Sequence, residues 1–144
     1  MAIVLVLTSY FLFLPTLEFL TGVPHKLGVF GQLKGNTQLL FTSIAIGWII
    51  GGLTEEIIFR GFFISKITNI LPGKTGAIIS VLITSTIFGY LHSYQGITGQ
   101  LLIGTIGAIL GGIYLMNNKR IILNIFIHGF VNTISMLMLY WGYV

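Results

Sequence analysis

Residues 53–60 read LTEEIIFR and place two adjacent glutamates and an arginine within an apolar run that extends over residues 39–63. The chain has only three acidic residues, and two of them are Glu55 and Glu56. Placing a charged side chain in the hydrocarbon of a membrane costs about 2.5 kcal/mol or more, so such residues face a bundle interior or water. A functional site is therefore the first expectation for this stretch.

Helical spacing separates the two glutamates from each other. Residues four apart lie on one face of a helix, whereas neighbours differ by about 100° around its axis. Glu56 is therefore expected to pair with Arg60 and to hold the helix in register. Glu55 points to another face and has no partner in its own helix, so we expect its partner on a different helix.

The composition excludes an ordinary water-soluble protein. Of the 144 residues, 55% are hydrophobic and 7% are charged, with a net charge of +4, whereas soluble domains are roughly one quarter charged. So little polar surface predicts an all-α, polytopic transmembrane helix bundle with lipid as its solvent. The basic residues are scattered and form no stripe, which excludes nucleic acid as a partner. The chain has no cysteine and no aspartate.

Five apolar segments approach the roughly 20 residues that are needed to cross a bilayer. They cover residues 1–20, 39–63, 76–91, 97–116 and 121–144, and together they predict a single integral-membrane domain over residues 1–144. Loops on the side of the N-terminus carry more lysine and arginine than the opposite loops. This asymmetry predicts a multi-pass protein of the cell membrane with a cytoplasmic N-terminus.

Glycine recurs within the apolar segments at spacings of three and four residues. Gly51 and Gly52 precede the two glutamates, and the fourth segment carries a longer series: Gly99, Gly104, Gly107, Gly111 and Gly112. Small residues at such spacings allow helices to approach closely in lipid. We interpret these glycines as packing positions.

Three further polar side chains lie within or at the end of apolar segments, namely His92, His128 and Asn132. His128 and Asn132 are four residues apart and are expected on one helix face. In lipid each polar group needs a partner, and these groups are the partners available to one another. We therefore expect them to meet Glu55 in a common wet pocket.

These residues resemble the motifs of the CPBP intramembrane proteases, a family named for CAAX prenyl endopeptidases and bacteriocin-processing enzymes. The resemblance covers about residues 39–132, and family members commonly have more spans, so the chain is interpreted as a shortened member. Three motifs occur in the family's order, as Glu55, Glu56 and Arg60 in EExxxR, Phe88 and His92 in FxxxH, and His128 followed by Asn132.

The resemblance implies an intramembrane endopeptidase that acts on a membrane-associated peptide or protein, CAAX-type, prenylated or bacteriocin-like. Peptide hydrolysis needs a base that activates water and donors for the oxyanion. Glu55, close to His92, is expected to activate the water, and His128 and Asn132 to stabilise the tetrahedral intermediate. Structural support is expected from the remaining motif residues, Glu56, Arg60 and Phe88.

Three alternatives use the same residues differently. Glu55, His92 and His128 could supply three ligands of an open zinc site, but no HExxH motif is present, so we favour a version without a cofactor. A non-catalytic membrane protein that confers bacteriocin immunity is the second alternative. A proton or ion pathway is the third, and it ranks last because Glu56 and Arg60 make the site locally neutral.

Overall fold

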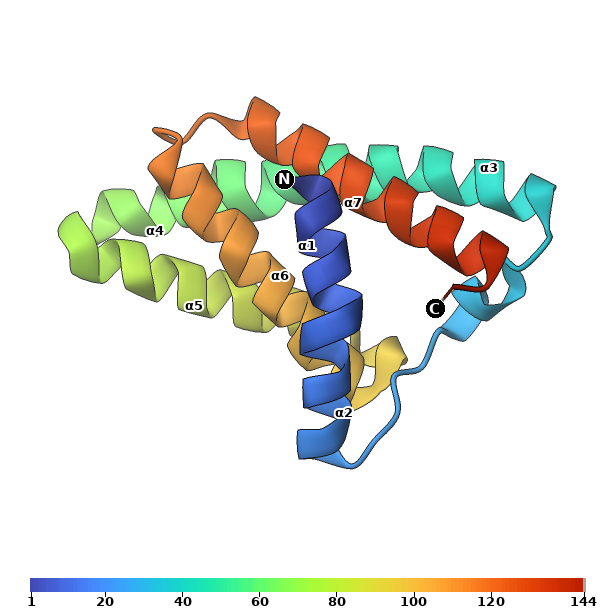
Figure 1. Ribbon diagram of the computed structural model, residues 1–144. Helices are drawn as coiled ribbons and strands as arrows, with labels where there is room; N and C mark the ends of the chain where they lie inside the picture. Colours follow the sequence, from blue (N-terminus) through green and yellow to red (C-terminus); the bar gives the residue numbers. More distant parts are fainter. Residues whose placement is uncertain (144) are drawn as a thin grey trace.

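The computed structural model describes residues 1–143, and all regular structure in this part of the chain is helical (Figure 1). Five helical stretches are long and apolar enough to cross a membrane, which confirms the predicted all-α bundle of a multi-pass membrane protein. The predicted last segment ended at Val144, which lies outside the described residues. The five stretches are Ala2–Thr21, Thr37–Ile70, Gly73–Leu91, Ser93–Met116 and Ile121–Trp141.

The first stretch is one helix that changes its winding in the middle. It consists of α1 (Ala2–Thr8), the π-helical turn η1 (Ser9–Phe13) and α2 (Leu14–Thr21). Pro15 follows the π turn and has no N–H for the carbonyl one turn earlier, so a local change of winding is expected there. The helix ends at Gly22, whose φ of +66° lies in the left-handed region, where glycine is the preferred cap.

The second stretch carries the two glutamates and is longer than predicted. It comprises α3 (Thr37–Ile46), the π-helical segments η3 (Gly47–Glu55) and η4 (Ile57–Ile64), and α4 (Ser65–Ile70). Asn36 begins it by accepting a hydrogen bond from the backbone N–H of Leu39. The predicted end at residue 63 was too early, because no helix breaker occurs before Pro72 and an exposed lysine can extend its charged end to the interface.

Three helices complete the bundle, and a short 3₁₀ turn lies between the first two stretches. The helices are α5 (Gly73–Leu91), α6 (Gly96–Met116) and α7 (Ile121–Trp141). A second 3₁₀ turn, η5 (Ser93–Gln95), joins α5 to α6, and η2 (Gly28–Gln32) precedes α3. In the view of Figure 1, α1 and α2 run steeply across α6 and α7.

Many large apolar side chains lie on the surface and several polar ones are buried, which is the reverse of the distribution in a water-soluble protein. Large apolar residues such as Phe19 and Met116 are almost fully exposed, whereas Glu56, Arg60 and Asn124 are buried. Lipid tails are as apolar as the side chains that face them, so burial brings apolar residues little advantage, whereas polar groups need partners inside the protein. The distribution fits the membrane as the solvent of this chain.

Glycines bring helices into close contact around the two glutamates. A Cβ at Gly129 in α7 would lie 2.5 Å from the ring of Trp48 in η3, and a Cβ at Gly52 would lie 3.3 Å from the backbone of Gly129. The backbones of η3 and α7 therefore touch directly. In α6, Gly104 and Gly107 likewise face α5, as predicted, but Gly112 faces open space.

The contact between η3 and α7 predicts a position-specific effect of an added methyl group. Gly129→Ala should lower the unfolding midpoint of the protein in detergent, at a cost of about 1–3 kcal/mol, because the methyl group would overlap the Trp48 ring. Gly112→Ala is the matched control and should leave the midpoint equal or higher, since helix-interior alanine is favoured by about 0.5–1 kcal/mol. Equal midpoints for the two variants would contradict this account of the contact.

Candidate active site

Glu56 and Arg60 form an ion pair at the centre of the bundle. An Nη1–H of Arg60 donates to Oε1 of Glu56 at 2.8 Å, and the two side chains are 2% and 0% exposed, respectively. Arg60 also donates through Nη2 to the carbonyl of Gly107 in α6 at 2.9 Å. Its guanidinium carbon lies 5.1 Å from the centre of the Phe88 ring, within the range of a cation–π contact. The predicted pair is therefore present and joins η4 to α6.

His128 on α7 lies between the two glutamates. Its Nδ1 is 2.8 Å from Oε1 of Glu56, and its Nε2 is 3.9 Å from Oε2 of Glu55. A carboxylate only accepts hydrogen bonds, so the hydrogen on Nδ1 points to Glu56 and Nε2 faces Glu55. Glu55 thus has a partner on another helix, as the sequence analysis expected.

The contact between Glu56 and His128 was not anticipated. Sequence spacing indicated only the pair with Arg60, because partners on other helices cannot be identified from helical periodicity. One signal was available: a carboxylate offers about four acceptor positions, and a single arginine leaves some of them free. Glu56 therefore both neutralises Arg60 and orients His128.

The two glutamates differ in their exposed surface. The Glu55 side chain is 22% exposed, whereas Glu56 is completely buried. Part of Glu55 is therefore open to the surroundings of the protein, whereas Glu56 can be reached only after a rearrangement of the bundle.

Asn132 lies one turn after His128 and contacts the same segment of the second span. Its Nδ2 donates to the carbonyl of Gly47 at 3.1 Å, and an amide nitrogen has a second hydrogen to donate. A Cβ at Gly51 would collide with this Nδ2 and would lie 3.5 Å from Nε2 of His128. The predicted common face of His128 and Asn132 is present, and a glycine leaves the space in front of it.

His92 lies at the C-terminal end of α5 and packs against the ring of Phe88. Its Nδ1 is 2.8 Å from the carbonyl of Phe88, one turn earlier in α5. The Phe88 ring is centred 4.9 Å from His92 and 6.1 Å from His128. No hydrogen bond or ion pair joins His92 to Glu55 in the structure. Glu55, His128 and Asn132 therefore lie along the contact of the second span with α7, and His92 lies at the end of α5 against the Phe88 ring.

The residues proposed as zinc ligands are not arranged as a three-ligand site. Within residues 1–143, no group of three histidine, cysteine, aspartate or glutamate side chains lies close enough to hold a metal ion. Glu55 and His128 are adjacent, but the nearest third candidate, Glu56, is already engaged by Arg60 and His128.

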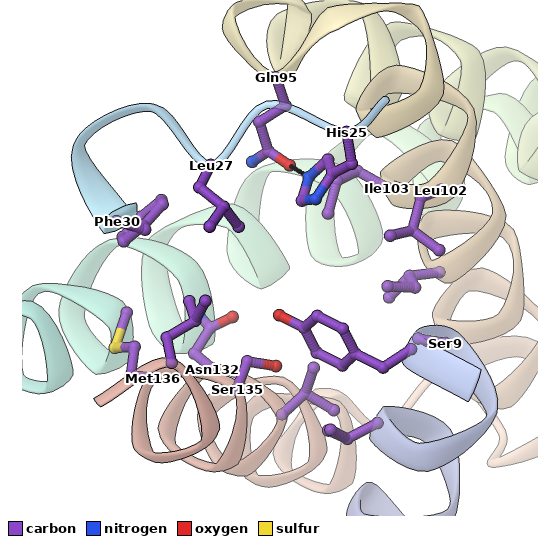
Figure 2. A pocket seen from close by; sticks show the side chains of 15 residues that line it. Ser9, His25, Leu27, Phe30, Gln95, Leu102, Ile103, Asn132, Ser135 and Met136 are labelled. Carbon is purple, nitrogen blue, oxygen red and sulfur yellow. Dashed lines mark hydrogen bonds between the residues drawn. The ribbon is translucent and has the colours of Figure 1, made fainter. Parts of the chain in front are cut away.

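A cavity of about 120 Å³ adjoins this site at Asn132 (Figure 2). Asn132 and Ser135 extend into it from α7, and His25 and Gln95 form its opposite side. Glu55, His92 and His128 do not line it. Of the four expected site residues, this cavity is lined by Asn132.

The fold and these side chains define a helical membrane protein with a charged, hydrogen-bonded site between its spans. A family model described as Type II CAAX prenyl endopeptidase Rce1-like matches residues 37–134, more than half of the chain. The chain belongs to this family of CAAX-type intramembrane proteases, which confirms the resemblance over residues 39–132. Comparisons with curated proteins and with solved structures gave no match.

The buried ion pair predicts a large loss of stability when its cation is removed. Arg60→Met should destabilise the protein by about 3–5 kcal/mol, because the Glu56 carboxylate would stay buried without its main partner. Thermal unfolding in detergent measures this loss. Lys66→Met removes an exposed cation from the same span and should change stability by less than about 0.5 kcal/mol. Similar values for both variants would contradict the assigned role of Arg60.

Proposed function

We propose that the protein cleaves a peptide bond of a membrane-associated substrate with water that Glu55 activates. The observation that supports this most directly is the position of His128, whose two ring nitrogens face Glu56 and Glu55. An imidazole fixed by one carboxylate beside a second, accessible carboxylate is typical of acid–base chemistry. The family membership supports a CAAX-type substrate, and a prenylated or bacteriocin-like peptide is the class that we propose.

In the proposed reaction Glu55 takes a proton from water, and the resulting hydroxide attacks the carbonyl carbon of the peptide. The carbonyl double bond becomes an oxyanion, which needs hydrogen-bond donors in a dry environment. Protonated Glu55 then donates its proton to the leaving amine as the carbon–nitrogen bond breaks. No step consumes a cofactor, and the carboxylate returns to its starting state.

His128 and Asn132 are the proposed oxyanion donors. Nε2 of His128 lies 3.9 Å from Oε2 of Glu55. Asn132 is one helical turn away, and its Nδ2 has a second hydrogen to donate besides the one that bonds to the carbonyl of Gly47.

His92 remains a proposed assistant to Glu55. Its Nδ1 is held by the Phe88 carbonyl, which leaves Nε2 as the nitrogen available to water or substrate. The Phe88 ring packs near His92, His128 and Arg60. We assign Phe88, Glu56 and Arg60 to positioning, because each contacts a proposed catalytic residue or the buried ion pair.

The central prediction concerns Glu55. Glu55→Gln keeps the shape of the side chain and removes the base, so the hydrolysis rate of a prenylated CAAX peptide should fall by about 10²–10⁴-fold. Cleavage is measured with purified protein in lipid, and the unfolding midpoint of the variant should equal that of the wild type. Glu18→Gln is the control, since it removes the third acidic residue but keeps an oxygen that can accept from the N–H of His25.

Full hydrolysis by Glu55→Gln would exclude Glu55 as the base. Protection against a bacteriocin that persists in Glu55→Gln cells would favour the alternative of a non-catalytic immunity protein. Loss of cleavage in both Glu55→Gln and Glu18→Gln would point to a general effect of acidic residues on folding. These outcomes separate an enzyme from a binding protein.

Metal dependence has its own expected outcome. In the proposed reaction no metal takes part, so prolonged treatment with EDTA and 1,10-phenanthroline should leave the cleavage rate unchanged, and elemental analysis should find zinc well below one ion per chain. The proposal is supported by the engagement of Glu56 with Arg60 and His128. Activity that disappears on chelation and returns with zinc would establish the metal-dependent alternative.

We also propose that the protein resides in the cell membrane with its N-terminus in the cytoplasm. Lys119 donates from its Nζ to Thr68 at 2.7 Å, so the turn after α6 lies beside the end of α4. The basic residues of the α4–α5 and α6–α7 turns therefore gather on one side of the bundle. An excess of lysine and arginine indicates the cytoplasmic side.

A further inference from the structure

The cavity beside Asn132 is built mainly from apolar side chains. Leu102 and Ile106 of α6 and Val131 of α7 line it and belong to the main apolar cluster of the bundle. Its volume is about 120 Å³. An apolar cavity of roughly 150 Å³ in another protein stays dry and binds benzene. The size and walls of this cavity therefore fit one apolar group no larger than a phenyl ring.

The cavity is closed on one side by a segment that is tied in place. The backbone N–H of His25 donates to Oε1 of Glu18 at 2.9 Å, and Nε2 of His25 is 3.0 Å from Oε1 of Gln95. The N–H of Lys26 donates to the carbonyl of Gln95 at 3.2 Å. These bonds hold residues 22–30 against the start of α6, so this wall exists before any ligand arrives (Figure 2).

Part of the wall comes from outside the region that matches the family model. The matched region begins at residue 37, whereas Val6, Tyr10, His25 and Leu27 all line the cavity. The first span and the following segment thus add a surface to the region that matches the family model. Whatever occupies the cavity is selected in part by residues outside that region.

The position of the cavity relates it to the proposed chemistry. Asn132 borders the cavity and lies four residues, or about 6 Å along the helix, from His128. One residue of an extended peptide spans about 3.3–3.6 Å. A side chain held in the cavity would therefore belong to a residue within about two positions of the peptide bond at Glu55 and His128.

We propose that this cavity is a specificity subsite that binds one apolar side chain of the substrate, and that the first 30 residues of the chain shape it. The inference rests on the proposed peptidase function for the identity of the ligand as a substrate. Large apolar side chains up to the size of phenylalanine are accepted, glycine leaves the cavity unfilled, and charged side chains are excluded by the apolar walls.

The first test compares the cleavage rates of different peptides before and after a larger side chain is placed in the cavity. Substrates are prenylated peptides that end in cysteine and three further residues, each of the three set in turn to glycine, leucine or aspartate. At one position the wild type should prefer leucine to glycine by about tenfold or more in kcat/KM. Ile103 lines the cavity, so Ile103→Phe places a ring in it and should abolish the preference for leucine over glycine. Ile109→Phe lies on the same helix and against the same cluster, and should keep the preference.

A second test does not depend on catalysis. The chain has no cysteine, so Ile103→Cys in the Glu55→Gln background provides a single thiol at the cavity. The leucine peptide should slow its modification by methyl methanethiosulfonate about tenfold, the glycine peptide should not, and Ile109→Cys should be unaffected by either. If Glu55→Gln still cleaves, the peptidase mechanism fails while this comparison continues to test the subsite.

Three results would overturn the subsite. Equal protection of the thiol by the leucine and glycine peptides would show that the cavity does not distinguish between substrate side chains. A thiol at position 103 that lipid alone protects from modification would show that a lipid tail already occupies the cavity. An unchanged leucine preference in Ile103→Phe would place the selection elsewhere.

Discussion

The structure depends on the solvation of one carboxylate. Glu56 has no exposed surface, and neither lipid nor water can satisfy it, so the protein must supply both charge and donors. Arg60 provides the charge from the same helix, and His128 provides an N–H from α7. Because Arg60 also bonds to the backbone of α6 at Gly107, three membrane-spanning stretches are joined through Glu56. The site is thus held together by the same interaction that holds the bundle.

This arrangement requires helix backbones to come unusually close. Gly51 and Gly52 on η3 lie against α7, and Gly129 on α7 leaves room for the ring of Trp48. Larger residues would separate the two helices and move Glu55 away from Nε2 of His128. The chain is π-helical around the two glutamates. Such segments are rare in proteins in general but frequent at functional sites. Close contact and altered winding together place two neighbouring glutamates on opposite nitrogens of one imidazole.

The sequence motifs and part of the cavity lining come from two different regions of the chain. The region that matches the family model, residues 37–134, contains every residue of the three motifs. The first span and the segment that follows it pack on α6 and α7 and complete the cavity beside Asn132. In the proposed function the matched region supplies the chemistry, and in the proposed subsite the preceding residues help to determine which side chains can bind.

The sequence alone determined five spans, the Glu56–Arg60 pair and the shared face of His128 and Asn132, because these follow from composition and helical periodicity. Only the tertiary structure decided that Glu56 bonds to His128, that Phe88 packs near both His92 and His128, and that the cavity reaches Asn132. These features depend on how each helix is rotated and how closely it approaches its neighbours. Local spacing carries no information on either quantity, since both arise from contacts between residues that are far apart in the chain.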